Sequence, residues 1–334
     1  MPTIETVTGA IDASELGTTL VHEHLMVRDE AVVAQWPHAG TIKESEPHWV
    51  RPGEERAVAV RAARKMVERE VRSICDPSAM FLGRDVSFMR SVAEETGLQV
   101  IACTGIYTYD ALPMFLLSRS PDQIAELFIH DIEQGIQGTD IKAAFIKVAA
   151  DEPGVTENIE KVHRAAARAS TQTGTPIMAH TRPASETGPR QIEIFEQEGV
   201  DLSRVQLAHT GDTDDLDYIE RVLDKGVFIG MDRYGLEIFL PFEKRQQTVL
   251  ALLERGHEER MFLSADACAT IDYYPVEMID QLVSAGLARD WNSNIVSDKV
   301  LPGLREAGMS AEQERTMMVD NPVAWLTGKR PAAA

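Results

Sequence analysis

Four histidines and one aspartate stand where strand-like apolar runs meet polar residues. His22 and His24 close the run TTLVHEHL, His180 ends PIMAHT, His209 ends VQLAHT, and Asp266 ends RMFLSAD. Because successive residues of a strand face opposite sides, His22 and His24 point in the same direction. Imidazole and carboxylate groups are ligands for divalent transition metals. These five residues therefore predict a metal site.

Lys147 interrupts the apolar run AAFIKVAA, where a buried ammonium group is costly without a partner. Three interpretations are open from the residue alone. The lysine pairs with an acid at the strand end, or forms an imine with a substrate carbonyl, or has taken up carbon dioxide as a carbamate. We favour the carbamate (N6-carboxylysine), because its two oxygens can bridge two metal ions. Without it, four histidines and one aspartate are few ligands for two ions.

A single histidine at a strand end is more often a packed, hydrogen-bonded residue than a ligand, so the joint placement carries the prediction. Other histidines lack that placement. His38 and His48 fall in an irregular segment, residues 31–52, and we expect exposed loop residues there. His163 lies inside a helical pattern, and we expect it on the surface of that helix.

The elements that must position these residues are strand-like segments that alternate with helical patterns. Strands separated by helices run parallel, and eight such units close into a barrel whose strand ends meet at one mouth. Thr156 and Gly174 delimit one helix, Ser120 starts another, and Ser310 with Gln313 form a capping box. The eight predicted strands are residues 18–24, 71–76, 98–107, 141–150, 175–180, 205–211, 226–232 and 260–266.

The sequence thus predicts an α/β fold, a single-domain eight-stranded parallel β/α (TIM) barrel. We expect the barrel to span residues 1–328, with a lid segment at about 267–300 and a loose tail at 329–334. The lid segment carries apolar residues that would cover a substrate channel. Its alternative is an ordinary helical connection that buries the same side chains.

Composition limits the classes of partner. The chain has 334 residues, 33 of them basic and 53 acidic, for a formal charge of -20. Such a surface repels nucleic acid and anionic membranes and suits a neutral or apolar small molecule. Cys75, Cys103 and Cys268 are odd in number and widely spaced, which argues against a disulfide framework. With no apolar signal segment at the N-terminus, we expect a cytoplasmic protein.

The motifs LGTTLVHEHL, CDPS, GRDVSFM, CTGIY, FIKVA, MAHT, LAHTGD, GMDRYG and SADAC follow in this order over nearly the whole chain. Together they resemble the phosphotriesterase family of the amidohydrolase superfamily, and within it the phosphotriesterase-like lactonases. The resemblance implies two divalent metal ions, zinc or else cobalt, manganese or iron. It also implies the ligands: His22, His24 and Asp266 for the more buried ion, His180 and His209 for the more exposed one, and carboxylated Lys147 with a hydroxide as bridges.

Further positions resemble the lactonase pocket. Tyr107 and Arg233 fall at the ends of the third and seventh strands, where the resemblance implies contact with the substrate and a part in catalysis. Their alternatives are an aromatic residue packed at a strand end and an arginine paired with a surface acid. Cys268 and Tyr273 resemble substrate-pocket residues, although some relatives carry Trp in place of Tyr273.

The function implied is hydrolysis of N-acyl homoserine lactones, which are quorum-sensing signals, with weak phosphotriesterase activity at the same centre. The hydroxide would attack the ring carbonyl, Asp266 would pass its proton to the leaving oxygen, and Tyr107 would orient the ring. A homodimer is expected from the resemblance. The alternatives are a dedicated phosphotriesterase, a metal-free lyase or aldolase that uses Lys147 as an imine former, and a non-catalytic binding barrel.

Overall fold

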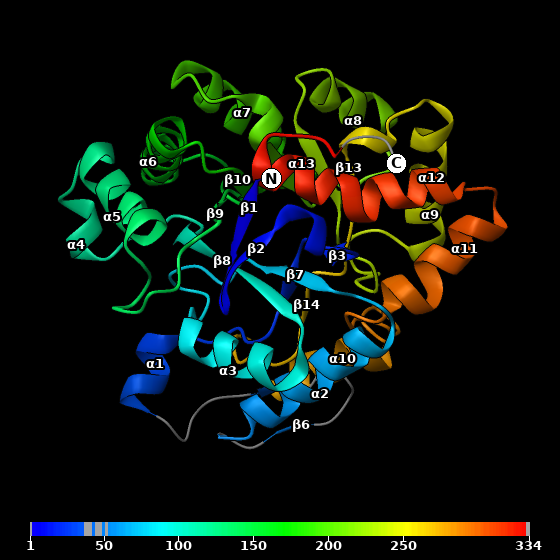
Figure 1. Cartoon of the computed structure of the whole chain (residues 1–334), viewed down its shortest axis with the longest axis horizontal. Coiled ribbons are helices and arrows are strands. Elements are labelled where there is room, and N and C mark those ends of the chain that lie inside the picture. Colours follow the sequence, from blue (N-terminus) through cyan, green and yellow to red (C-terminus); the bar gives the residue numbers. More distant parts are fainter. Residues whose placement is uncertain (1, 37–41, 44–48, 51–52, 332–334) are drawn as a thin grey trace.

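The computed structural model describes residues 2–36, 42–43, 49–50 and 53–331. Eight parallel strands form one sheet in the order β13-β12-β11-β10-β9-β8-β7-β3, with helices around it (Figure 1). The predicted parallel barrel is confirmed. Its strands are β3 (Thr19–Leu20), β7 (Ser73–Asp76), β8 (Gln99–Ile106), β9 (Phe145–Ala149), β10 (Ile177–His180), β11 (Val205–Ala208), β12 (Phe228–Met231) and β13 (Met261–Leu263).

The first and last strands meet through two short extensions. Strand β4 (Glu23–His24) continues the first strand, β14 (Ala267–Cys268) follows the last, and these two pair in parallel. The backbone N–H of Asp266 also donates to the carbonyl of His22 at 3.0 Å. The seam between the two ends of the sheet therefore closes at the carboxyl ends of the strands.

Helices lie between successive strands and cover the outside of the sheet. The predicted end signals are present: Thr156 accepts from the Ile159 N–H to cap α6, and Gly174 ends that helix at φ 73°. Ser120 and Ser310 form capping boxes. The main helices are α2 (Glu55–Glu68), α3 (Val86–Thr96), α5 (Pro121–Glu133), α6 (Glu157–Thr173), α7 (Thr187–Gln197), α8 (Leu216–Leu223), α9 (Phe242–Glu254) and α11 (Leu301–Glu306).

Shorter elements complete the chain. Helix α4 (Met114–Leu117) precedes α5, and α10 (Val276–Ser284) lies within the predicted lid segment. Helices α12 (Ala311–Arg315) and α13 (Asn321–Thr327) close the chain, and α1 (Glu30–Gln35) leads into two short paired strands, β5 (Ile42–Lys43) and β6 (Trp49–Val50). The predictions for His38 and His48, and for the end of the C-terminal tail, lie outside the described residues.

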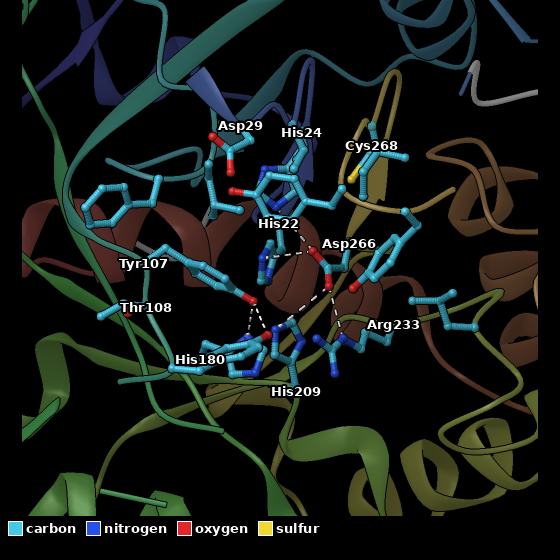
Figure 2. A pocket seen from close by; sticks show the side chains of 18 of the residues that line it. His22, His24, Asp29, Tyr107, Thr108, His180, His209, Arg233, Asp266 and Cys268 are labelled. Carbon is cyan, nitrogen blue, oxygen red and sulfur yellow. Dashed lines mark hydrogen bonds and ion pairs between the residues drawn. The ribbon is translucent and has the colours of Figure 1, made fainter. Parts of the chain in front are cut away.

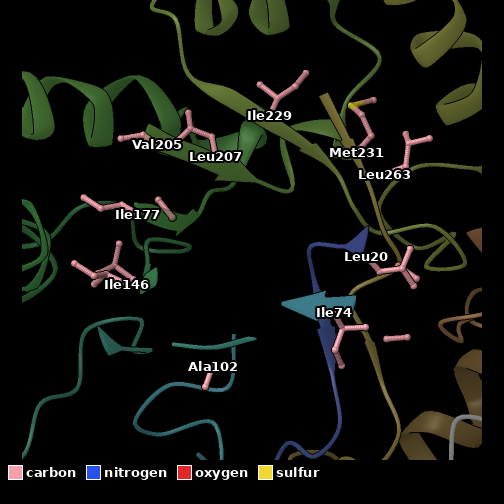
Figure 3. Close-up of a cluster of buried hydrophobic side chains, with 14 of the residues drawn as sticks. Leu20, Ile74, Ala102, Ile146, Ile177, Val205, Leu207, Ile229, Met231 and Leu263 are labelled. Carbon is pink, nitrogen blue, oxygen red and sulfur yellow. The ribbon is translucent and has the colours of Figure 1, made fainter. Parts of the chain in front are cut away.

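Two apolar layers hold the barrel in shape. The outer layer packs the strands against the helices, and the inner layer fills the barrel with large side chains such as Phe145, Phe228, Phe262 and Trp325. The hairpin of β1 (Thr3–Thr6) and β2 (Gly9–Asp12) contributes Ile4 to this inner layer. Figure 3 labels the outer layer on all eight strands: Leu20, Ile74, Ala102, Ile146, Ile177, Val205, Leu207, Ile229, Met231 and Leu263.

His163 contradicts its prediction as a helix-surface residue. Its side chain is 0% exposed, its Nδ1 donates to the Ile159 carbonyl at 2.8 Å, and its Nε2 accepts from the Gln191 amide at 2.9 Å. The ring also stacks on Phe195 of α7. Helix α6 packs against α5 and α7 as well as β9, so more of its circumference is buried than one amphipathic face. Burial lowers the pKa of His163 to about 4.

The described part of the chain has no helix both long enough and apolar enough to span a bilayer.

Candidate metal centre

The carboxyl ends of five strands bring the predicted ligands together around one cavity (Figure 2). Asp266 Oδ1 lies 3.1 Å from Nε2 of His22 and 3.3 Å from Nε2 of His24. Asp266 Oδ2 lies 3.8 Å from Nε2 of His209, and the rings of His209 and His180 are 4.4 Å apart between centroids. Side chains from opposite ends of the chain therefore converge on a single point.

Asp232 orients two of these imidazoles from behind. Its Oδ2 accepts from Nδ1 of His22 at 2.8 Å, and its Oδ1 accepts from Nδ1 of His209 at 3.0 Å. His22, His209 and Asp232 are close enough to form a metal group of their own. However, the carboxylate occupies the two Nδ1 atoms and leaves both Nε2 atoms facing Asp266, so we interpret it as an orienting partner. A side chain at Gly230 would overlap this carboxylate.

The other two histidines, His24 and His180, are each also held by a hydrogen bond on the ring nitrogen that faces away from the cavity. Nδ1 of His24 shares a hydrogen bond of 2.8 Å with the Ser78 hydroxyl, which leaves its Nε2 toward Asp266. His180 is turned the other way, because its Nε2 donates to Asp151 at 2.8 Å and its Nδ1 faces the cavity. Such a second hydrogen bond fixes both the tautomer and the direction of a ligating imidazole.

Lys147 lies at the floor of the cavity and is 0% exposed. Its Nζ is 3.3 Å from Nε2 of His22 and 3.4 Å from the Met178 sulfur. Among the described residues no carboxylate oxygen lies at ion-pair distance from this amine, so the interpretation as a salt-bridged lysine is not supported. Burial lowers the pKa of Lys147 to about 8. A neutral amine is the form that can take up carbon dioxide or form an imine.

The donor set fits a pair of divalent cations. Burial lowers the pKa of His22, of His180 (to about 4) and of His209, so these imidazoles keep a free lone pair at neutral pH. Burial alone would raise the pKa of Asp266, yet the neighbouring imidazoles and Arg233 hold it well below its usual value. Neutral imidazoles beside an ionised carboxylate are a typical site for transition metals.

Two of the candidate ligands have a strained backbone. His209 has φ 66° and Asp266 has φ 50°, the left-handed region that residues other than glycine rarely adopt. Each such residue costs about 1–3 kcal/mol, and the cost is tolerated where the surroundings fix the conformation. At both positions the strained residue follows the end of a strand and turns its side chain into the cavity.

Tyr107 and a second tyrosine stand beside His180. The Tyr107 hydroxyl lies 3.4 Å from Nδ1 of His180 and is hydrogen-bonded to the Tyr109 hydroxyl. Burial raises the pKa of Tyr107 well above its usual value and that of Tyr109 to about 12, so both phenols stay protonated. The sequence prediction found Tyr107 and missed Tyr109, although the motif IYTYD places them two residues apart, on the same side of an extended segment.

Arg233 reaches the centre as predicted, and its partner is a residue of the site. Its Nε donates to Asp266 Oδ2 at 3.0 Å, and its Nη1 donates to Asp212 at 2.8 Å. The guanidinium also lies over the Phe239 ring, 4.4 Å from its centroid. The alternative of an arginine paired with a surface acid is wrong, because both carboxylates are largely buried.

A cavity of about 770 Å³ opens above these residues. Cys268 and Tyr273 line it, as predicted for the pocket, and so do residues of the predicted lid segment. Most of its wall is apolar, and the polar groups gather at the candidate ligands. The apolar residues of the wall include Val27, Phe81, Leu82, Leu112, Leu236, Ile238, Phe239, Ile271, Met278, Ile279, Leu282 and Trp291.

Several orienting residues were missing from the sequence prediction, namely Ser78, Asp151, Asp212 and Asp232. Asp232 carried a local signal, because it follows a strand directly in GMD. The others follow the ends of β7, β9 and β11, and each contacts a residue from a neighbouring strand, so their positions depend on strand pairing and on the course of the chain after each strand.

Comparison with known proteins gives a consistent result. A sequence model of the phosphotriesterase family matches residues 2–326. An aryldialkylphosphatase of Saccharolobus solfataricus is 43% identical over 94% of this chain and 96% of its own length. A phosphotriesterase homology protein of Mycobacterium tuberculosis is 36% identical over 96% of this chain and 97% of its own. The solved structure of the phosphotriesterase from Mycobacterium tuberculosis has a TM-score of 0.89 at 36% identity, and covers 97% of this chain and 98% of its own.

Proposed function

The chain belongs to the phosphotriesterase family of metal-dependent hydrolases, and from that premise we propose that it is a lactonase. Its proposed substrates are N-acyl homoserine lactones, the quorum-sensing signals, and related lactones. One observation carries the proposal: a cavity of about 770 Å³ with largely apolar walls ends at the candidate ligands and at the protonated Tyr107 phenol. That combination suits a neutral ester with an apolar tail.

The residues that would hold the metal ions are those proposed from the sequence. When bound, two divalent cations supply a water of lowered pKa and polarise the ester carbonyl. We propose zinc, with cobalt, manganese or iron as alternatives. His22, His24 and Asp266 would hold one ion, His180 and His209 the other, and carboxylated Lys147 both.

Asp266 is the proposed proton acceptor. Its Oδ1 lies 3.1 Å from Nε2 of His22 and 3.3 Å from Nε2 of His24, on the cavity side of both rings, and its lowered pKa keeps it ionised before the reaction. It would then pass this proton to the ring oxygen as the ester bond breaks. Arg233 holds Asp266 Oδ2 in place at 3.0 Å and adds positive charge to the cavity wall, which favours a carbonyl oxygen that becomes negative.

Tyr107 is the proposed hydrogen-bond donor to the lactone. Its phenol remains protonated over the working pH range, because burial raises its pKa. A donor fixed in position lowers the barrier when it contacts an oxygen that gains negative charge. The acyl tail would lie between the loop after β12, which carries Ile238 and Phe239, and helix α10.

A dedicated phosphotriesterase is the second candidate. The relative that supports it is the aryldialkylphosphatase of Saccharolobus solfataricus, with 43% identity. The deciding experiment compares kcat/KM of the zinc-loaded protein for a long-chain acyl homoserine lactone and for a paraoxon-like ester. We expect the lactone to be favoured by about 100-fold or more, and a preference for the phosphotriester would overturn the proposal.

An imine-forming lyase would use the same lysine without metal. Borohydride treatment in the presence of substrate would then attach the substrate covalently to Lys147. We expect no such adduct and full dependence of lactone hydrolysis on added metal.

The homodimer, and the absence of nucleic-acid and membrane partners, stay predictions.

A further inference from the structure

Glu23 stands between the two histidines of the HEH motif and takes no part in the chemistry described so far. Alternation along the strand turns its side chain away from His22 and His24. In a barrel strand, the side that faces away from the lumen packs against the surrounding elements, and the Glu23 side chain is 1% exposed. A buried carboxyl group needs hydrogen-bond donors around it, so its partners indicate what it holds.

The partners of Glu23 surround Asp266. Oε1 of Glu23 accepts from the Ser264 hydroxyl at 2.8 Å and from the Ala265 N–H at 2.7 Å. Oε2 accepts from the Ala267 N–H at 3.2 Å. One carboxyl group therefore binds the backbone immediately before and immediately after Asp266.

This stretch has little other regular support. Strand β13 ends at Leu263 and β14 begins at Ala267, so residues 264–266 belong to neither strand. The backbone turns through the left-handed conformation at Asp266, at φ 50°. Without hydrogen-bonding partners, a peptide in the left-handed conformation would relax toward the right-handed or the extended conformation.

The lid segment is attached at the same place. The Ser293 hydroxyl is hydrogen-bonded to the Glu23 carboxyl group, and the Trp291 indole N–H donates to the Asp266 carbonyl at 3.0 Å. Ser293 is buried and Trp291 lines the cavity. The end of the lid segment, the first strand and the turn at Asp266 thus form one hydrogen-bonded unit.

We propose that Glu23 is a positioning residue for Asp266, because it fixes the peptide groups on both sides of that ligand. The inference rests on the proposed metal centre. Each Glu23 oxygen accepts from a backbone N–H group, Oε1 from Ala265 and Oε2 from Ala267, and both oxygens can do so whether or not the carboxyl group is ionised. A glutamine of the same shape would turn an N–H group toward another N–H or hydroxyl donor and lose part of the set.

The test compares Glu23→Gln with a control that weakens the same strand at its other end. The side-chain amide of Asn321, which is 0% exposed, donates to the carbonyls of Glu258 and Met261, both at 2.8 Å. Asn321→Ala thus removes buried side-chain-to-backbone hydrogen bonds from the start of β13, on the side of the barrel opposite to the cavity. Like Glu23→Gln, it removes buried side-chain hydrogen bonds to the backbone of this part of the chain, but Asn321 makes no contact with Asp266.

Zinc affinity is measured by competition with a chelator, and amide hydrogen exchange of residues 264–268 is followed in the zinc-free protein. For Glu23→Gln we expect zinc to bind about 10–100-fold more weakly and exchange to be faster, as for other partners that orient a ligand. We expect kcat to fall while KM changes by less than about twofold. Asn321→Ala should lower the melting temperature and leave zinc affinity and local exchange unchanged.

Zinc binding and exchange in Glu23→Gln equal to those of the wild type, with a loss of thermal stability alone, would overturn the inference. If Glu23→Gln does not fold, Ser293→Ala removes a single donor. We then expect about threefold weaker zinc binding, and unchanged binding would count against the proposal. A wild-type protein that binds no zinc would overturn the metal centre itself, which is a different outcome.

Discussion

The Tyr107 hydroxyl, 3.4 Å from Nδ1 of His180, is the proposed hydrogen-bond donor to the lactone. Tyr107→Phe removes the hydroxyl and keeps the ring. We expect lactonase kcat to fall by about 10–100-fold, because the leaving ring oxygen loses its hydrogen bond. Hydrolysis of an activated phosphotriester, whose leaving group needs no such help, should change by less than about threefold. Steady-state kinetics on both substrates check this, and an equal loss on both would show that Tyr107 acts on the metal ligands instead.

Lys147 and His180 would serve either chemistry. Lys147→Ala removes the proposed bridge, and His180→Ala removes a proposed ligand of the second ion, so we expect the activated water to be lost. We expect each variant to lose both activities by about 1,000-fold or more. Lys142→Ala is the matched control, because Lys142 lies just before β9 and is only partly buried. Full activity of Lys147→Ala or of His180→Ala would contradict a dinuclear centre.

At the scale of elements, α10 is the part of the lid segment that we expect to select the acyl chain. Ile279 of this helix is 3% exposed and lines the cavity, whereas Val283, one turn later, does not line it. Ile279→Ala removes apolar contact area, at about 25 cal/mol per Å². We expect KM for a long-chain lactone to rise by about 5–10-fold and that for a short-chain lactone to change less than twofold. Val283→Ala is the control, and equal effects on both chain lengths would contradict the role of α10.

The contact between α6 and α7 predicts a pH effect on stability. His163 titrates near 6.5 when unfolded and near 4 when folded, because burial disfavours its charged form. Below pH 6.5 the unfolded chain therefore binds a proton that the folded one does not, and stability falls as the pH drops toward 4. The loss from this group is at most about 3 kcal/mol. His163→Leu should flatten the fall in melting temperature between pH 7 and pH 4.5, and identical curves would show that His163 does not contribute.

Among the elements, those marked by local sequence signals could be predicted, and those that depend on contacts between elements could not. Strand ends and helix caps are local signals, so the barrel, Thr156 and Gly174 could be read from adjacent residues. His163 could not, because its burial depends on α7, which packs over α6. Asp151 has a similar limit: its contact with His180 depends on the pairing of β9 with β10, two strands that are separated in the sequence by α6.

At the scale of the whole molecule, metal binding should stabilise the fold. The candidate ligands come from strands at both ends of the sheet, so bound ions would join the two sides of the seam. A ligand that binds only the folded state at about 1,000 times its Kd adds about 4 kcal/mol. We expect a chelator to lower the melting temperature and zinc to restore it, as followed by circular dichroism. A melting temperature that does not respond to either would argue against ions at the seam.

The closure of the barrel between its first and last strands also has a consequence for biosynthesis. His22 and its hydrogen-bonding partner Ser264 are 242 residues apart in the chain. A ribosome therefore exposes the HEH segment early, while its carboxylate partner is still many seconds from being translated, at about 5–20 residues per second. The proposed metal centre can form only after the eighth strand has left the exit tunnel, so we expect a nascent or truncated chain to be inactive toward esters.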